Sequence, residues 1–240
     1  MSRMFPFITE TWNPLGGRCP HRCIYCWSMS KKGLVSRYNM RKYQGAPRII
    51  ESELKRKFKP GAFVFVQDMS DLFAVEVPSE LIRVILRKIG EFPKTNFLLQ
   101  TKNPSCYIPF LFSFEIPENA VLGTTIETDS CHFYTPSPFK CYWQISDAED
   151  PELRLIAMQR IAEEHTGHRI FISIEPILDF TKDFAEQIRM IKPWAVAVGY
   201  DNYGNRLPEP SLKKTLHLIQ ELEKFTIVYR KTLRKAWWEK

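Results

Sequence analysis

Three cysteines lie close together near the start of the chain, in the stretch GGRCPHRCIYCWS at residues 16–28. Cys19, Cys23 and Cys26 are separated by three and then two residues, and they are half of the six cysteines in the sequence. Spacings this short bring three thiolates around one metal centre without help from distant parts of the fold. Thiolates are the ligands of iron–sulfur clusters, which normally take four of them. The three cysteines therefore predict a cluster with one metal position left open for a substrate or cofactor.

A structural zinc site is the main alternative for this motif. Such a site would be completed by His21, Cys106, Cys131 or Cys141. Zinc motifs usually contain two separated pairs of ligands, and the sequence has no second pair with that spacing. The N-terminus lacks the pattern of a signal peptide, and no apolar run approaches the ~20 residues that cross a bilayer. We therefore expect a cytoplasmic protein with no membrane partner, where reduced cysteines bind metal more often than they form disulfides.

The elements that would position this motif alternate along the chain as short apolar runs and longer amphipathic patterns. The apolar runs predict strands at 8–12, 62–66, 96–101, 119–127, 169–175 and 195–199, with a seventh at 225–229. Helical spacing of apolar residues predicts helices within 47–58, 78–92, 150–165, 181–191 and 211–225, and a shorter irregular one within 103–114.

This alternation is typical of a parallel sheet that is buried on both faces. Six such units in 240 residues favour an α/β barrel or open barrel, and no GxGxxG follows a strand to indicate a dinucleotide fold. We expect a single domain over residues 1–240, with a core at about 8–224 and a C-terminal extension at 225–240. The composition, with 44% hydrophobic and 25% charged residues, is that of a globular protein.

Polar residues follow the predicted strands at their carboxyl ends, which is where the active sites of such barrels form. Any one of them has an ordinary explanation, because strand ends meet water, but six polar ends together predict a site beside the cysteines. The residues are Trp12 and Asn13; Gln67, Asp68, Ser70 and Asp71; Gln100, Thr101 and Lys102; Thr124, Thr125 and Glu127; Ser173 and Glu175; and Tyr200, Asp201 and Asn202.

The stretch CPHRCIYC resembles the CxxxCxΦC signature of the radical S-adenosylmethionine (radical SAM) superfamily, with Tyr25 in the aromatic position. The wider pattern of TWNP, VQDMSDLF, LLQTKNP, GTTIE and SIEPIL is similar to a small phage and prokaryotic group, related in style to spore photoproduct lyase. This resemblance implies a partial (β/α)6 barrel of the TIM type. It also implies a 4Fe–4S cluster on Cys19, Cys23 and Cys26, with SAM at the open iron as the source of a 5′-deoxyadenosyl radical.

The resemblance also implies further cofactor contacts, while the catalytic residues stay unassigned. Tyr25 would lie near the adenine, and Thr125 and Glu127 would meet the ribose. Ser173 and Glu175 would line the cofactor or substrate pocket. The chain has no GGE element for the SAM amino group, so Ser70, Asp71 or backbone carbonyls would supply that contact, and Lys102 is a candidate for the carboxylate.

Two partners are expected for such an enzyme. One is an electron donor such as a flavodoxin or ferredoxin. The other is nucleic acid, favoured by the net charge of +7 and by cations near the cluster loop in RCPHRC and SKKGLVSRYNMRKYQ, although a solvated basic surface explains the charge as well. The competing class of function is a non-catalytic iron–sulfur or zinc-binding module for electron transfer or nucleic-acid binding.

Overall fold

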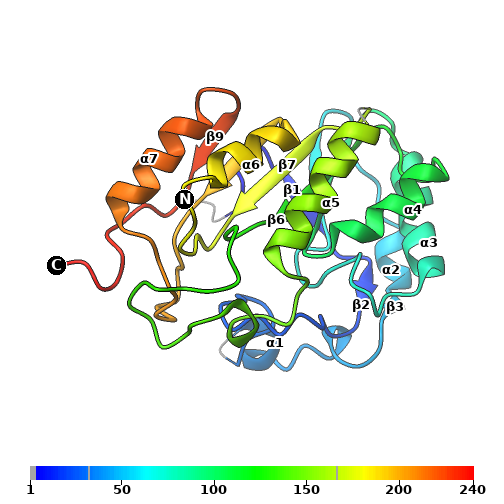
Figure 1. Cartoon of the computed structure of the whole chain (residues 1–240). Helices are drawn as coiled ribbons and strands as arrows, with labels where there is room; N and C mark the ends of the chain where they lie inside the picture. Colours follow the sequence, from blue (N-terminus) through cyan, green and yellow to red (C-terminus); the bar gives the residue numbers. More distant parts are fainter. Residues whose placement is uncertain (1–3, 32, 166) are drawn as a thin grey trace.

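The computed structural model describes residues 4–31, 33–165 and 167–240. A parallel sheet of seven strands curls into half of a barrel (Figure 1). Its strands are β1 (Glu10–Trp12), β4 (Phe63–Val66), β5 (Asn96–Thr101), β6 (Ala120–Thr125), β7 (Ile170–Ile174), β8 (Ala195–Val198) and β9 (Ile227–Arg230). They pair in the order β1-β4-β5-β6-β7-β8-β9, so each strand lies beside the next in sequence. The predicted partial α/β barrel is confirmed.

A separate two-stranded ribbon lies before the first large helix. Its strands, β2 (Leu15–Gly16) and β3 (Arg48–Ile49), are antiparallel and bracket the segment that contains the cysteines. The α-helices are α1 (Leu34–Arg37), α2 (Glu51–Leu54), α3 (Ser79–Gly90), α4 (Tyr107–Phe112), α5 (Pro151–Glu164), α6 (Phe184–Ile191) and α7 (Leu212–Leu222). Short 3-10 turns occupy Arg41–Tyr43, Pro104–Cys106 and Tyr142–Gln144.

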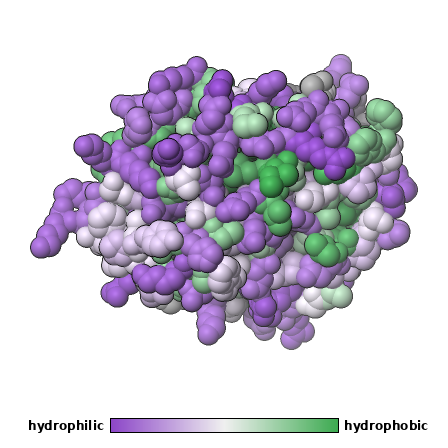
Figure 2. Space-filling model, viewed as in Figure 1, coloured by the Kyte–Doolittle hydropathy of each residue, from purple (hydrophilic) through white to green (hydrophobic). Residues whose placement is uncertain are grey.

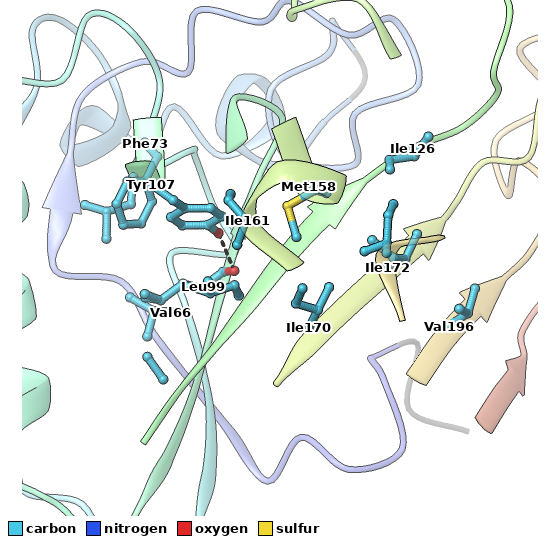
Figure 3. Close-up of a cluster of buried hydrophobic side chains, with 14 of the residues drawn as sticks. Val66, Phe73, Leu99, Tyr107, Ile126, Met158, Ile161, Ile170, Ile172 and Val196 are labelled. Carbon is cyan, nitrogen blue, oxygen red and sulfur yellow. Dashed lines mark hydrogen bonds between the residues drawn. The ribbon is translucent and has the colours of Figure 1, made fainter. Parts of the chain in front are cut away.

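The main hydrophobic core lies between the convex face of the sheet and the helices that cover it. Alternate strand residues such as Val66, Leu99, Ile172 and Val196 point outward and pack against buried residues of the helices, among them Met158 of α5 (Figure 3). Tyr107 of α4 is buried here, and its hydroxyl donates to the backbone carbonyls of Leu99 and Gly123 at 2.7 and 2.9 Å. Burying this apolar set is what holds the helices against the sheet.

The concave face of the sheet is filled at one end only. Residues that alternate with the outer set, including Leu98, Val121 and Phe171, form a second cluster together with Phe5 of the N-terminal segment. The side chains next along the same face are polar: Gln100, Thr125 and Ser173. The period of two along each strand thus separates an apolar floor from a polar upper layer at the carboxyl ends.

The helix expected within residues 47–58 is mostly absent. Arg48 and Ile49 pair with Leu15 and Gly16 as β3, and only α2 is helical in this stretch. The Arg48 guanidinium donates to nearby backbone carbonyls, including that of Gln44 at 2.9 Å, and α2 buries none of its residues. Apolar residues at helical spacing were therefore a misleading signal, because tertiary pairing decides this segment.

The outer surface of the helices is mostly hydrophilic, with a few hydrophobic side chains gathered over α5 and its neighbours in the view of Figure 2. Leu153 and Ile156 of α5 and Met190 of α6 are among the exposed ones. The seventh strand expected near the C-terminus is present as β9 and completes the sheet edge. Within the described residues, the helices are all too short or too polar to span a membrane.

Candidate functional site

A cavity of about 620 Å³ opens at the carboxyl ends of the strands. This size is within the range of cavities that hold small molecules and cofactors. Its walls come from the cysteine loop between β2 and α1, from the ends of β4 to β8, and from Met4 and Phe5 of the N-terminal segment. The short loops that follow parallel strands all emerge at one edge of a sheet, which explains why residues far apart in sequence meet here.

Cys19, Cys23 and Cys26 all line this cavity. A backbone hydrogen bond from Cys26 to Cys23 folds the loop, and the Met29 amide donates to the Cys26 sulfur at 3.2 Å. The Cys23 sulfur lies 3.0 Å from the Ser146 hydroxyl oxygen. Burial raises the pKa of the Cys19 and Cys26 thiols, to which nearby carboxylate and thiol charges add, so a bound cation would be needed to favour the thiolates.

No three His, Cys, Asp or Glu side chains in residues 4–31, 33–165 and 167–240 are grouped as the ligands of a single metal ion. A zinc ion needs its ligands in contact with one centre. In a cubane cluster each thiolate binds a different iron, which holds the sulfurs farther apart. The three cysteines line one cavity, and thiols are the donors that iron–sulfur clusters take.

The cysteine loop is tied to the strand ends through His21 and Asp71. The His21 Nε2 atom lies 2.6 Å from an Asp71 carboxylate oxygen, and both side chains are buried. Asp71 also accepts from the Thr101 hydroxyl at 3.0 Å and the Lys102 amide at 2.8 Å. Burial alone raises the pKa of this carboxyl, but the His21 contact and the amide and hydroxyl donors outweigh it and lower the pKa. Asp71 therefore remains a carboxylate that fixes the loop.

Gln67 makes a second clamp where β4 ends. Its side chain exchanges two hydrogen bonds of 2.9 Å with the backbone of Leu15 and donates to Ser70 at 2.8 Å. The backbone of Gln67 has a φ of 64°, which is costly for a residue with a side chain. The contacts compensate for this strain and hold the segment before the cysteines against the segment 67–71.

Glu127 is fully buried and sits behind the cavity wall in a charged network. Its carboxylate receives an Arg154 guanidinium at 2.8 Å and the Lys102 ammonium, and it accepts hydrogen bonds from the hydroxyls of Tyr25 and Tyr142. Burial by itself raises the pKa of this carboxyl, but the two cations lower it to about 2. The network holds Tyr25, whose ring lines the cavity, against the end of β6.

Gln100 and Thr125 present polar atoms on the wall between β5 and β6. Gln100 donates to the Thr125 hydroxyl at 3.0 Å, and its amide oxygen is buried with no hydrogen-bond donor in the described structure. A Cβ atom at Gly123 would come within 2.7 Å of that oxygen, so the glycine makes room for the Gln100 side chain. The Thr125 hydroxyl is therefore the polar group of this pair that a ligand could meet, whereas the unpartnered Gln100 oxygen is buried against Gly123.

Glu175 lines the cavity just after the end of β7, near Ser173. Burial raises the pKa of its carboxyl to about 7, although the charge of Lys231 acts in the opposite direction. Glu175 packs closely on the backbone of β8, since a Cβ atom at Gly199 would lie 2.9 Å from its carboxylate. This carboxyl is therefore divided between its protonated and ionised forms near neutral pH.

Six of the seven cofactor-binding residues expected from the sequence line the cavity: Tyr25, Ser70, Asp71, Thr125, Ser173 and Glu175. Glu127 does not, and its acceptor atoms are occupied by the buried network. Lys102 lines the cavity, but its ammonium is paired with Glu127. Of the four residues considered for a zinc site, only His21 lines the cavity, and its Nε2 atom contacts Asp71.

Sequence reasoning missed several residues of the wall, including Met4, Phe5, Arg37 and Tyr203. Phe5 carried no local signal, because its role depends on packing against Phe171. A tyrosine that closely follows a strand end, as Tyr203 does, could have been selected by the same rule that selected Asp201 and Asn202.

Comparison with known proteins gives one family and two similar structures. The family described as "Protein of unknown function (DUF5131)" matches residues 4–217. No curated protein sequence matches the chain. Two solved structures of spore photoproduct lyase mutants are similar, one of them with bound AdoMet and dinucleoside spore photoproduct.

Both structures have a TM-score of 0.56 and 13% sequence identity. They cover 93% and 94% of this chain, which in turn spans 64% of the length of each. At this identity the likeness establishes a shared partial-barrel fold.

Proposed function

The chain belongs to the DUF5131 family, whose description assigns no activity. From the residues of its site, we propose that it is a radical SAM enzyme. The observation that carries this proposal is that Cys19, Cys23 and Cys26 face the same cavity as the polar carboxyl ends of the strands. The partial barrel shared with spore photoproduct lyase supports it.

The three cysteines would hold a 4Fe–4S cluster, and SAM would occupy the adjoining cavity. A bound, reduced cluster supplies the electron that cleaves SAM into methionine and a 5′-deoxyadenosyl radical, which abstracts hydrogen from the substrate. An external donor such as a flavodoxin or ferredoxin would deliver that electron.

The chain's own residues position and enclose these groups. His21 and Asp71 hold the cysteine loop at the strand ends, and Gln67 fixes the segment beneath it. Tyr25 forms one side of the cavity, where we place the adenine, and the Thr125 hydroxyl is suited to the ribose.

Ser70 and the backbone near Asp71 would contact the amino group of SAM, because the Asp71 carboxylate already accepts several hydrogen bonds. Ser173 and Glu175 would face the cofactor or the substrate from the cavity wall at the end of β7. Glu127 would act by holding Tyr25 and Lys102 in place, in contrast to the direct ribose contact that the sequence favoured.

Anaerobic reconstitution with iron and sulfide tests the proposal. The expected result is about four irons per chain, the broad visible absorbance of a 4Fe–4S cluster, and 5′-deoxyadenosine formed from SAM once the protein is reduced. Cys19→Ala, Cys23→Ala and Cys26→Ala should each lose both the cluster and the cleavage. Cys131→Ala, whose sulfur lies outside the cavity wall, should keep them. Stoichiometric zinc with no cleavage of SAM would support a zinc-binding module and contradict the enzyme.

A further inference from the structure

The positive charge of the chain is concentrated in one segment. Residues 11–50 contain eight of the 34 lysines and arginines and none of the 27 aspartates and glutamates. The net charge of +7 for the whole chain is therefore carried by this segment, which we call the basic arm. Forty residues without a carboxylate between Glu10 and Glu51 also include the three cysteines.

The basic arm forms one side of the cavity and continues past its mouth. Arg37 of α1 lines the cavity, and Lys31, Arg41 and Lys42 are exposed beyond it. In Figure 1, α1 lies at the lower edge of the molecule, away from the helices that cover the convex face of the sheet. The basic arm thus carries exposed cations on the same segment that lines the cavity.

The described cations of the basic arm differ in whether they pair with a carboxylate or a backbone carbonyl. Arg22 pairs with Asp147, and Arg48 donates to backbone carbonyls, so those two side chains are used by the fold. Within residues 4–31 and 33–165 and the rest of the described chain, Lys31, Arg37, Arg41 and Lys42 form no ion pair with a carboxylate. Their charge is available to a partner.

Aromatic rings lie at the same opening. Trp27 and Tyr203 line the cavity, yet they are 38% and 49% exposed, which places them at its mouth. Tyr38 is 66% exposed at the end of α1, with the Arg37 guanidinium 5.6 Å from its ring centroid. Exposed rings beside a track of cations are the arrangement that binds unpaired bases and their phosphates.

We propose that the basic arm binds the sugar–phosphate backbone of a single-stranded nucleic acid, and that Trp27 and Tyr203 stack on a base at the mouth of the cavity. This inference rests on the proposed function, because the bound strand would be the substrate of the radical chemistry. Binding itself needs neither cluster nor SAM. The two proposals are therefore tested separately.

Fluorescence anisotropy with a labelled single-stranded DNA and the same sequence as RNA measures the binding over a series of salt concentrations. A variant with Lys31→Gln, Arg41→Gln and Lys42→Gln should lose at least about tenfold in affinity at low salt. Its slope of log K against log salt should become less steep by about 2, because each phosphate contact on a single strand contributes about 0.7. None of the three residues lines the cavity.

The matched control changes three exposed lysines that precede β4 and β5, at the opposite edge of the sheet: Lys57→Gln, Lys59→Gln and Lys94→Gln. It removes the same charge and should leave the affinity and slope of the wild-type chain. Equal losses in the two variants, or no binding of either strand at low salt, would overturn the proposal while leaving SAM cleavage to be judged by its own assay.

Stacking is tested with Tyr203→Ala, which should weaken single-strand binding about fivefold to a hundredfold and leave the salt slope unchanged. Heparin and a duplex of the same sequence serve as competitors. Tighter binding of the duplex would contradict the single-strand assignment. Equal competition by heparin would show that the basic arm binds polyanions in general and would contradict specific binding of nucleic acid.

Discussion

Glu127 and Glu175 follow neighbouring strands and look alike in the sequence, but their surroundings push their pKa values apart. Both are buried enough for desolvation to raise the pKa. At Glu127, Arg154 and Lys102 outweigh that effect and lower the pKa to about 2. At Glu175, the charge of Lys231 opposes desolvation without outweighing it, and the pKa rises to about 7. The low pKa suits Glu127 to a structural role as a permanent carboxylate, and the raised pKa suits Glu175 to exchanging protons.

Replacing Glu175 with glutamine should change how stability depends on pH. A carboxyl whose folded pKa exceeds its unfolded value stabilises the fold fully at low pH and loses that contribution as pH rises through the folded pKa. The free energy of unfolding of the wild-type chain should therefore fall, relative to Glu175→Gln, between about pH 4.5 and pH 7. The difference is at most about 3 kcal/mol. Urea denaturation at pH 5 and pH 8 measures it.

The exposed Glu76 provides the control for this experiment. Glu76→Gln should follow the pH profile of the wild-type chain. Parallel profiles for the wild type and Glu175→Gln would show that the carboxyl has the same pKa in the folded and unfolded chains and would remove its assignment as a proton-exchanging group.

Residue roles were only partly predictable from the sequence. Polar residues at strand ends identified Ser70, Thr125 and Ser173, because the position along a strand determines which edge a side chain reaches. Glu127 met the same rule, but it pairs with Arg154, 27 residues away on α5, and with Tyr142 in the connection between them. Only the folded chain reveals such a partner, so its role could not be derived from local pattern.

At the scale of elements, the buried network joins the cysteine loop, the ends of β5 and β6, and α5. The side chains of Arg154 and Glu127 are both fully buried. Glu127 is the carboxylate partner of both Arg154 and Lys102, so removing a member of this buried network costs more than breaking an exposed ion pair. Arg154 of α5 is therefore linked to the cavity wall through Glu127 and Tyr25.

Arg154→Met should lower the free energy of unfolding by about 3–5 kcal/mol. The double variant with Glu127→Gln should not recover that loss, because Lys102 then loses its buried carboxylate partner. Chemical denaturation measures both. Arg160→Met, which breaks an exposed pair with Glu164 on the same helix, should change stability by about 1 kcal/mol or less. A similar loss in both single variants would contradict the importance of burial.

Most of the secondary structure could be predicted because buried parallel strands are nearly continuous apolar runs. The run at 96–101 coincides with β5, and the one at 170–174 lies within the predicted 169–175. The stretch 47–58 failed because its apolar residues serve a two-stranded ribbon and a short turn, which depend on Leu15 and Trp12. Long-range pairing overrides local periodicity in such short segments.

At the scale of the whole molecule, the N-terminal segment fills the concave face of the sheet. Phe5 packs against Phe65 and Phe171, with ring centroids 6.0 and 4.6 Å apart, and also lines the cavity. Its ring forms part of the floor beneath the polar layer. The floor of the site therefore combines strand residues with Phe5, which lies outside every strand and helix.

Phe5→Ala should lower the free energy of unfolding by about 3 kcal/mol, since a buried aromatic side chain leaves a void when truncated. Thermal and urea denaturation check this value. Phe114→Ala serves as the control, because Phe114 is 93% exposed and should change stability little. Equal effects of the two substitutions would mean that the segment around Phe5 does not pack into the barrel.

The order of the strands also determines when each strand can pair during synthesis of the chain. Because each strand pairs with the one synthesised before it, the sheet can grow from β1 toward β9 as the chain leaves the ribosome. The amino-terminal segment, however, meets its last neighbours only at β7 and at Lys231, whose ammonium donates to the Met4 carbonyl. The contact between Met4 and Lys231 beside the pocket can therefore form only after residue 231 has been synthesised.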